Sequence, residues 1–215
     1  MNKNLTEIVY ILDRSGSMSG LEKDTIGGYN SFLEKQKKED GDAVVTTVLF
    51  DDKYDMVHDR VDIKKVKALT NKEYYARGMT ALLDAIGRTI NYIDARHKNA
   101  LESEVPFKTI VVITTDGYEN ASREFDSDKV KSMIEHQKKK YGWEFLFLGA
   151  NIDAVETAKA FGIDEKRSVS YCADKKGTSL NFDCVSEAVS DVRYGRPMAA
   201  SWKEKIETHL KSKKR

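Results

Sequence analysis

The chain has 215 residues, of which 36 are Lys or Arg and 35 are Asp or Glu, so its formal net charge is +1. This balance argues against a chain-wide basic field for nucleic acid, and no apolar run approaches the roughly 18 residues of a membrane span. The length suits one domain with a small appendage, and it suffices to bury a core without disulfides or metal.

Short apolar runs alternate with segments of helical periodicity. Each run is rich in β-forming residues and too short for a buried helix, which is typical of strands. We expect six strands at residues 6–13, 43–50, 54–61, 109–115, 144–148 and 167–172. The polar turn Asp51-Asp52-Lys53 predicts that the second and third strands form a hairpin.

Helical spacing of apolar residues follows most of these runs. We expect helices near residues 26–38, 82–93, 130–137, 154–161 and 180–192. A polar, helix-compatible stretch also lies between the third strand and Gly78. Strands that alternate with helices predict a mostly parallel α/β sheet.

The composition changes at the carboxyl-terminal end. Residues 201–215 carry a net charge of +4 and begin with the spacing of a capping box at Ser201. One face of the expected helix consists of Trp202, Ile206 and Leu210. We therefore divide the chain into a domain at residues 1–195 and a basic amphipathic helix or tail at residues 196–215. Its apolar stripe either docks on the body or is offered to a partner.

Carboxyl and hydroxyl side chains stand at three points where strands end or helices begin. Asp13-Arg14-Ser15-Gly16-Ser17 ends the first strand, Thr80 precedes the long helix, and Asp116 ends the strand at 109–115. In open α/β sheets, ligands bind at the carboxyl ends of strands where the strand order reverses. Oxygen ligands suit hard cations. We predict a metal site formed by Asp13, Ser15, Ser17, Thr80 and Asp116.

This pattern resembles the metal-ion-dependent adhesion site of von Willebrand factor type A domains. The resemblance rests on Asp13-x-Ser15-x-Ser17, Thr80 and Asp116-Gly117, and it covers residues 5–192. It implies a Rossmann-like, doubly wound sheet in the order 3-2-1-4-5-6, with the third strand antiparallel and helices on both faces. It also implies bound Mg²⁺, with Mn²⁺ or Ca²⁺ as alternatives, in a standalone intracellular member of bacterial or phage type.

The expected function is protein binding rather than catalysis. We interpret the chain as an adhesion or scaffold module, not an enzyme, that engages an Asp or Glu of a partner protein through the metal. Arginines beside the metal would attract such an acidic side chain. The expected rim of the partner-binding surface consists of Arg14, Met18, Arg77, Met79 and Tyr118.

Two other classes of function are kept as alternatives. A metal-assisted phosphohydrolase of haloacid-dehalogenase-like type also has an Asp after its first strand, but it needs a second acid where this chain has Ser15. A nucleic-acid-associated protein would use the basic tail or Lys138-Lys139-Lys140, although no aromatic residues interleave with either run.

We expect a cytoplasmic protein that does not contact membranes. The first residues contain no apolar core of a signal peptide. Cys172 and Cys184 are too few for a disulfide framework, so we expect reduced thiols.

Several polar residues near the site have roles that the sequence leaves open. Asp84 is expected to satisfy loop backbone donors rather than bind metal, and Glu119 and Asn120 are candidates for tuning the site. Asn151 either caps the helix that begins near residue 153 or approaches the metal.

Overall fold

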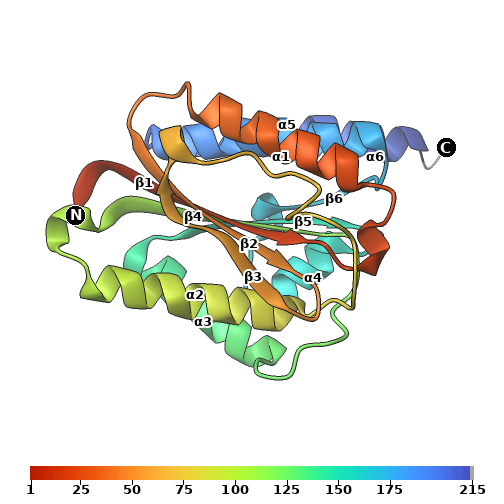
Figure 1. The fold of residues 1–215 in the computed structure, drawn as a ribbon, viewed down its shortest axis with the longest axis horizontal. Coiled ribbons are helices and arrows are strands. Elements are labelled where there is room, and N and C mark those ends of the chain that lie inside the picture. Colours follow the sequence, from red (N-terminus) through yellow and green to blue (C-terminus); the bar gives the residue numbers. More distant parts are fainter. Residues whose placement is uncertain (214–215) are drawn as a thin grey trace.

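A computed structural model describes residues 1–213 and shows one sheet between two layers of helices (Figure 1). Its strands are β1 (Asn2–Asp13), β2 (Asp42–Phe50), β3 (Tyr54–Asp62), β4 (Pro106–Thr115), β5 (Glu144–Ala150) and β6 (Ser168–Tyr171). The order across the sheet is β3-β2-β1-β4-β5-β6, with β3 antiparallel to β2 and the other neighbouring pairs parallel. The predicted fold class, strand order and hairpin are therefore confirmed.

Two groups of helices cover the sheet. They are α1 (Glu22–Gln36), α2 (Leu82–Asn99), α3 (Ser127–Tyr141), α4 (Ala154–Ala160), α5 (Lys175–Arg193) and α6 (Glu204–Lys213). One face of the sheet packs against α1, α5 and α6, and the other packs against α2, α3 and α4 (Figure 1). Each face of the sheet therefore has its own hydrophobic core.

The central strand β1 shows why its sequence is continuously apolar. Side chains alternate between the two faces of a strand, and Ile8, Tyr10 and Leu12 enter the core beneath α1 and α5. Val9 and Ile11 enter the core on the opposite face. Both faces are covered, as is usual for parallel sheets, so no position in this segment is left for a polar side chain.

The order of the sheet reverses at β1. The chain passes from β1 to β2 on one side and later returns to β4 on the other. Leu12 accordingly pairs with Leu49 of β2 and with Thr114 of β4. The carboxyl ends of β1 and β4 thus lie side by side, and they bring Asp13 and Asp116 to one edge of the sheet.

The helix-compatible stretch before Gly78 is not an α-helix. A short 3₁₀ turn at Ile63–Lys65 is followed by an irregular segment. The side chain of Asn30 bonds both backbone groups of Leu69, accepting from its N–H at 2.8 Å and donating to its carbonyl at 2.9 Å. Buried Tyr74 donates to the carbonyl of Asp13 at 2.6 Å. These tertiary contacts hold the segment without helical hydrogen bonds.

Helix α5 begins five residues earlier than its apolar pattern indicated. Asp174 caps it by accepting a hydrogen bond from the N–H of Gly177 at 2.7 Å. The first turn is polar, so hydrophobic spacing does not reveal it.

The carboxyl-terminal stripe docks on the body. Trp202 and Ile206 are buried in the core beneath α5, and Trp202 Nε1 donates to the carbonyl of Lys166 at 2.9 Å. A 3₁₀ turn at Ala200–Lys203 precedes α6, and Ser201 lies inside this turn, so it does not stand at the N-cap position that the predicted capping box requires. Residues 214 and 215 of the predicted basic tail lie outside the described residues. No helix within residues 1–213 has the length and apolar character of a membrane span.

Candidate metal site

The carboxylate of Asp13 is buried and held from two directions. Its Oδ1 accepts a hydrogen bond from the N–H of Ser15 at 2.6 Å, and its Oδ2 accepts one from the hydroxyl of Thr115 at 2.6 Å. Ser15 belongs to the loop after β1 and Thr115 is the last residue of β4. Asp13 therefore links the two strands whose ends form the site.

Three hydroxyl groups and the second carboxylate meet beside Asp13. Ser15 Oγ lies 3.0 Å from Ser17 Oγ, which donates to Asp116 Oδ1 at 2.5 Å. A Cβ built on Gly117 would lie 3.2 Å from Ser17 Oγ and 3.4 Å from Thr80 Oγ1. The absence of a side chain at Gly117 leaves room between these oxygens. All five predicted ligand residues thus lie at one edge of the sheet.

The charges at this edge are poorly compensated by the protein itself. Within residues 1–213, the buried Oδ2 of Asp116 has no hydrogen-bond partner. Burial raises the pKa of Asp116 and raises the pKa of Asp13 to about 6. Buried acceptors normally have partners, and buried charges are normally paired or coordinate a metal. A set of carboxylate and hydroxyl oxygens with one unpartnered oxygen fits a hard divalent cation such as Mg²⁺.

Asn120 fixes the position of Thr80. Its side-chain Oδ1 accepts from the N–H of Thr80 at 2.9 Å, and its own N–H donates to the carbonyl of Thr80 at 3.0 Å. Neighbouring Glu119 accepts from the N–H of Leu83 at 2.9 Å, at the first turn of α2. The loop after Asp116 therefore positions the loop that supplies Thr80, a role that the sequence left open.

Asp84 satisfies loop backbone groups, as its position predicted. Its two oxygens accept hydrogen bonds from the N–H groups of Arg123, Glu124 and Phe125 at 2.9, 2.9 and 3.0 Å. Both oxygens are engaged by the backbone, which accounts for this carboxylate without a metal.

Arg14 was placed on the exposed rim, and that prediction is wrong. Its side chain is buried, with Nε 3.1 Å from Asp51 Oδ2, Nη1 donating to the carbonyl of Glu73 at 3.1 Å, and Nη2 paired with Asp55. Arg77 shares these acids, with Nε 2.5 Å from Asp51 Oδ2. Asp51 is fully buried, and its charge is paired with both guanidinium groups. The sequence did not predict this ion pair.

Met18 was also placed wrongly on the rim. The 3₁₀ turn at Gly16–Met18 directs it into the core beneath α1, where 1% of its surface is exposed. Met79 and Tyr118 are exposed by 52% and 65%, and the Arg77 side chain by 31%. Of the five predicted rim residues, Arg77, Met79 and Tyr118 therefore remain at the surface.

A cleft of about 610 Å³ extends from Tyr118 past Asn151 to Cys172 and Asp174. Asn151 adopts a φ of 56° and does not cap α4; Asp153 does so, by accepting from the N–H groups of Val155 and Glu156. Of the two roles expected for Asn151, that of a cap for this helix is therefore wrong.

Comparisons with known proteins identify the fold. The solved structures that match include proximal thread matrix protein 1 from the mussel byssus, with 17% identity over 87% of this chain and a TM-score of 0.57. The VWA2 paralogue of ArnB from Sulfolobus acidocaldarius matches with 16% identity over 86% of this chain and a TM-score of 0.55. The chain spans 46% and 45% of the lengths of these two structures.

A match of nearly equal length is the vWF domain of the type V pili tip protein Mfa5 from Porphyromonas gingivalis. It has 10% identity, a TM-score of 0.64, and coverage of 93% of this chain and 98% of its own. No protein-family model and no curated protein sequence matches the chain. The architecture, the strand order and these neighbours agree: the chain has the fold of von Willebrand factor type A domains.

Proposed function

We propose that the chain is a protein-binding module, not an enzyme, that holds Mg²⁺ at Asp13, Ser15, Ser17, Thr80 and Asp116. One observation carries the proposal: the buried Oδ2 of Asp116 has no hydrogen-bond partner within residues 1–213 and lies beside a group of convergent hydroxyls. When bound, Mg²⁺ would supply a positive charge for an Asp or Glu of the partner protein.

The protein's own residues prepare this site for binding. Asp13 is held by Ser15 and Thr115, and Asn120 holds the backbone of Thr80. These residues have little conformational freedom left to lose when a partner binds, which favours affinity for the partner. The site residues therefore need little rearrangement when a partner arrives.

The surroundings suit a protein partner better than a small substrate. Met79 and Tyr118 are exposed next to the site, and Met and Tyr are enriched at protein interfaces. Ser15 stands where the phosphohydrolase alternative needs a second acid. The pilus tip protein among the fold neighbours also supports a role in protein contact.

The test begins with the metal, because that step needs no partner. Mg²⁺ binding is measured by calorimetry for the wild type, for Thr80→Val and for Ser19→Ala. Thr80→Val removes a hydroxyl with little change of shape, whereas Ser19 is exposed in the same loop as Ser17 and is not among the five ligand residues. We expect Thr80→Val to weaken Mg²⁺ binding at least about tenfold and Ser19→Ala to leave it unchanged. Equal affinities of the two variants would contradict the site.

The partner is then sought by affinity capture from a lysate. The wild type is compared in Mg²⁺ and in EDTA, alongside Thr80→Val and Ser19→Ala in Mg²⁺. Proteins retained by the wild type and Ser19→Ala in Mg²⁺, and released by EDTA and by Thr80→Val, would support metal-dependent binding. Retention of the same proteins under all four conditions would refute it.

A further inference from the structure

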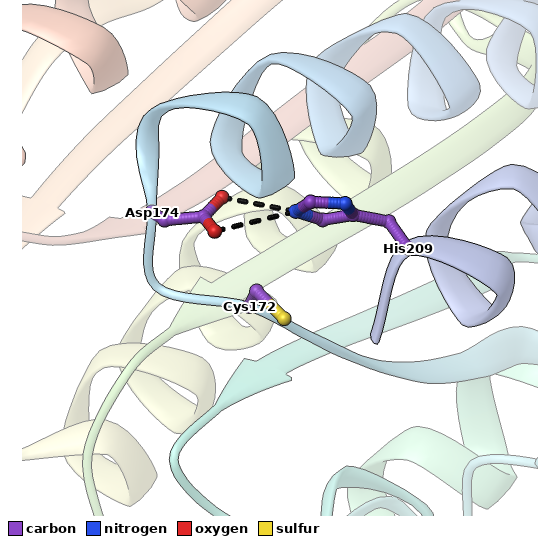
Figure 2. A group of neighbouring side chains, drawn as sticks. All are labelled: Cys172, Asp174 and His209. Carbon is purple, nitrogen blue, oxygen red and sulfur yellow. Dashed lines mark hydrogen bonds and ion pairs between the residues drawn. The ribbon is translucent and has the colours of Figure 1, made fainter. Parts of the chain in front are cut away.

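A second group of metal-ligating side chains lies at the far end of the cleft that begins at Tyr118. Cys172 follows β6, Asp174 caps α5, and His209 projects from α6 (Figure 2). One ligand atom from each residue lies within 4.8 Å of the others. His209 Nε2 is 3.1 and 3.3 Å from the two oxygens of Asp174.

We propose that Cys172, Asp174 and His209 form a binding site for Zn²⁺ or a chemically similar transition-metal ion. A sulfur and an imidazole nitrogen suit such ions, whereas Mg²⁺ prefers oxygen. The site is separate from the one formed by Asp13 and Asp116, and it does not depend on the function proposed for those residues.

The distances are close to those of a tetrahedral zinc site. Zinc bonds of about 2.0 to 2.3 Å place neighbouring ligand atoms roughly 3.5 Å apart. Asp174 and His209 already stand at about that separation, at 3.1 and 3.3 Å. The ligand atom of Cys172 lies within 4.8 Å of the other two, so it needs to approach by at most roughly 1.3 Å, which a side-chain rotation can supply.

The backbone brings the ligands together. A Cβ on Gly177 would lie 2.1 Å from the carbonyl oxygen of Cys172, so the glycine permits the first turn of α5 to approach Cys172 closely. Asp174 is oriented by the N–H of Gly177, and His209 is buried. Lys213 Nζ lies 3.2 Å from Asp174 Oδ2, but its side chain is 57% exposed and can turn away when an ion enters.

The arrangement has a structural consequence and leaves room for one more ligand. Its three residues come from the end of β6, the start of α5, and α6, so a bound ion would fasten α6 to the body. Cys172 and Asp174 line the cleft, where water or a partner's side chain can complete a four-ligand shell.

Co²⁺ is the probe, because thiolate ligation of Co²⁺ gives a charge-transfer absorption band that oxygen ligands do not give. The intact, reduced chain is titrated in excess Mg²⁺, which competes with Co²⁺ for any site made of oxygen ligands alone. The variants are Cys172→Ser, Asp174→Asn and His209→Gln, and the matched control is Cys184→Ser. Cys184 is buried in α5 and lies outside the cluster.

We expect one Co²⁺ per chain to give the charge-transfer band. Addition of Zn²⁺ should displace the Co²⁺ and abolish the band. Affinity should fall at least about tenfold in each ligand variant and remain unchanged in Cys184→Ser. Absence of the band in the wild type, or an undiminished band in Cys172→Ser, would overturn the proposal. Thermal unfolding in EDTA shows which variants are folded. If Cys172→Ser does not fold, the loss of Co²⁺ affinity in Asp174→Asn or His209→Gln tests the proposal instead.

Discussion

At the scale of single residues, the site at the edge of the sheet contains two carboxylates whose ionised forms are unfavourable in the folded chain. Asp13 and Asp116 are both buried, and burial raises the pKa of each. A raised pKa means that the ionised carboxylate is less stable in the folded chain than in the unfolded chain. At neutral pH, these residues therefore oppose folding of the metal-free chain.

Asp13→Asn should make the metal-free protein more stable. The oxygen of the new amide can still accept the hydrogen bond from the N–H of Ser15, and its NH₂ can donate to the Thr115 hydroxyl. That hydroxyl can in turn donate to the carbonyl of Gly117, which lies 3.2 Å away. Since the pKa of Asp13 is about 6, we expect a gain of about 1–3 kcal/mol at neutral pH in EDTA. Urea unfolding measures it. The same variant should lose the stabilisation that Mg²⁺ gives the wild type.

Asp128→Asn is the control for Asp13→Asn, because it makes the same change of charge at an exposed position in α3. It should not stabilise the protein in EDTA, because the dipole of α3 favours an acid in its first turn, and it should not change the response to Mg²⁺. An Asp13→Asn protein that is less stable than the wild type in EDTA, or that is still stabilised by Mg²⁺, would contradict the argument from buried charge.

His58 should make the protein less stable in mild acid. It is buried in β3 with Nδ1 3.0 Å from Thr47 Oγ1, and burial lowers its pKa, opposed by weaker effects of the Lys67 backbone and Glu73. The unfolded chain takes up this proton near pH 6.5, but the folded chain does so only at lower pH. The contribution of His58 to the free energy of unfolding therefore falls as the pH decreases through about 6.5. Proton uptake by Asp13, whose pKa burial raises to about 6, acts in the opposite direction, so the effect of His58 is read from the difference between variants.

The comparison is between urea unfolding at about pH 7.5 and about pH 5.5. His58→Gln should make the protein relatively more stable at about pH 5.5 than the wild type is, because it removes this titrating group. His136→Gln, at an exposed position in α3, should show the same change as the wild type. If the free energy of unfolding changes equally in His58→Gln and the wild type, burial of His58 is not the source.

At the scale of elements, two loops form the site together. The N–H of Gly16 donates to the carbonyl of Gly78 at 3.1 Å, which joins the Ser15–Ser17 loop to the one that supplies Thr80. Gly78 has a φ of 68°, and its Cβ would lie 2.0 Å from Asp52 Oδ1. A change of backbone at Gly78 should therefore disturb both loops.

Gly78→Ala should destabilise the protein by about 1–2 kcal/mol, the cost of a left-handed residue with a side chain. It should also weaken Mg²⁺ binding several-fold, because strain at Gly78 displaces Thr80. Gly20→Ala is the matched control: Gly20 has a φ of 90°, and a Cβ there would meet nothing within 4 Å. It should show similar destabilisation with normal Mg²⁺ affinity. Equal Mg²⁺ affinities in the two variants would separate Gly78 from the site.

The elements also show how far the sequence could be interpreted. Strand β1 was predicted because its apolar run is short and rich in β-forming residues, and the structure shows that both of its faces are buried. The irregular structure of the segment before Gly78 was not predicted, because its backbone hydrogen bonds are made by Asn30, which is distant in sequence. Arg14 was misplaced for the same reason: Asp51 and Asp55, which bury it, belong to the β2–β3 hairpin. Local patterns do not record such contacts.

At the scale of the molecule, the strand order explains where polar functional side chains can lie. Both faces of the sheet are covered by helices, so functional side chains are confined to loops at its edges. The site at Asp13 lies where the strand order reverses. The cleft from Tyr118 leads along the same side to the docked helix α6 at Lys213. The proposed metal site and the docked helix α6 thus border one surface.

The predicted boundary at residue 195 can be tested by removing residues 196–215. Of the elements described within residues 1–213, residues 1–195 contain every strand and all α-helices except α6, so we expect them to fold. Removal of buried Trp202 and Ile206 should lower the free energy of unfolding by about 3–5 kcal/mol, and Trp202→Ala in the intact chain should account for most of this loss. Circular dichroism and urea unfolding measure both.

Leu210→Ala is the control for Trp202→Ala, because Leu210 is only partly buried, and it should cost less. The shortened chain should keep its response to Mg²⁺, since all five oxygen-ligand residues precede α3. It should lose the Co²⁺ band, since His209 is gone. A shortened chain that fails to fold would place α6 within the same folding unit as the sheet, and the boundary at residue 195 would then be wrong.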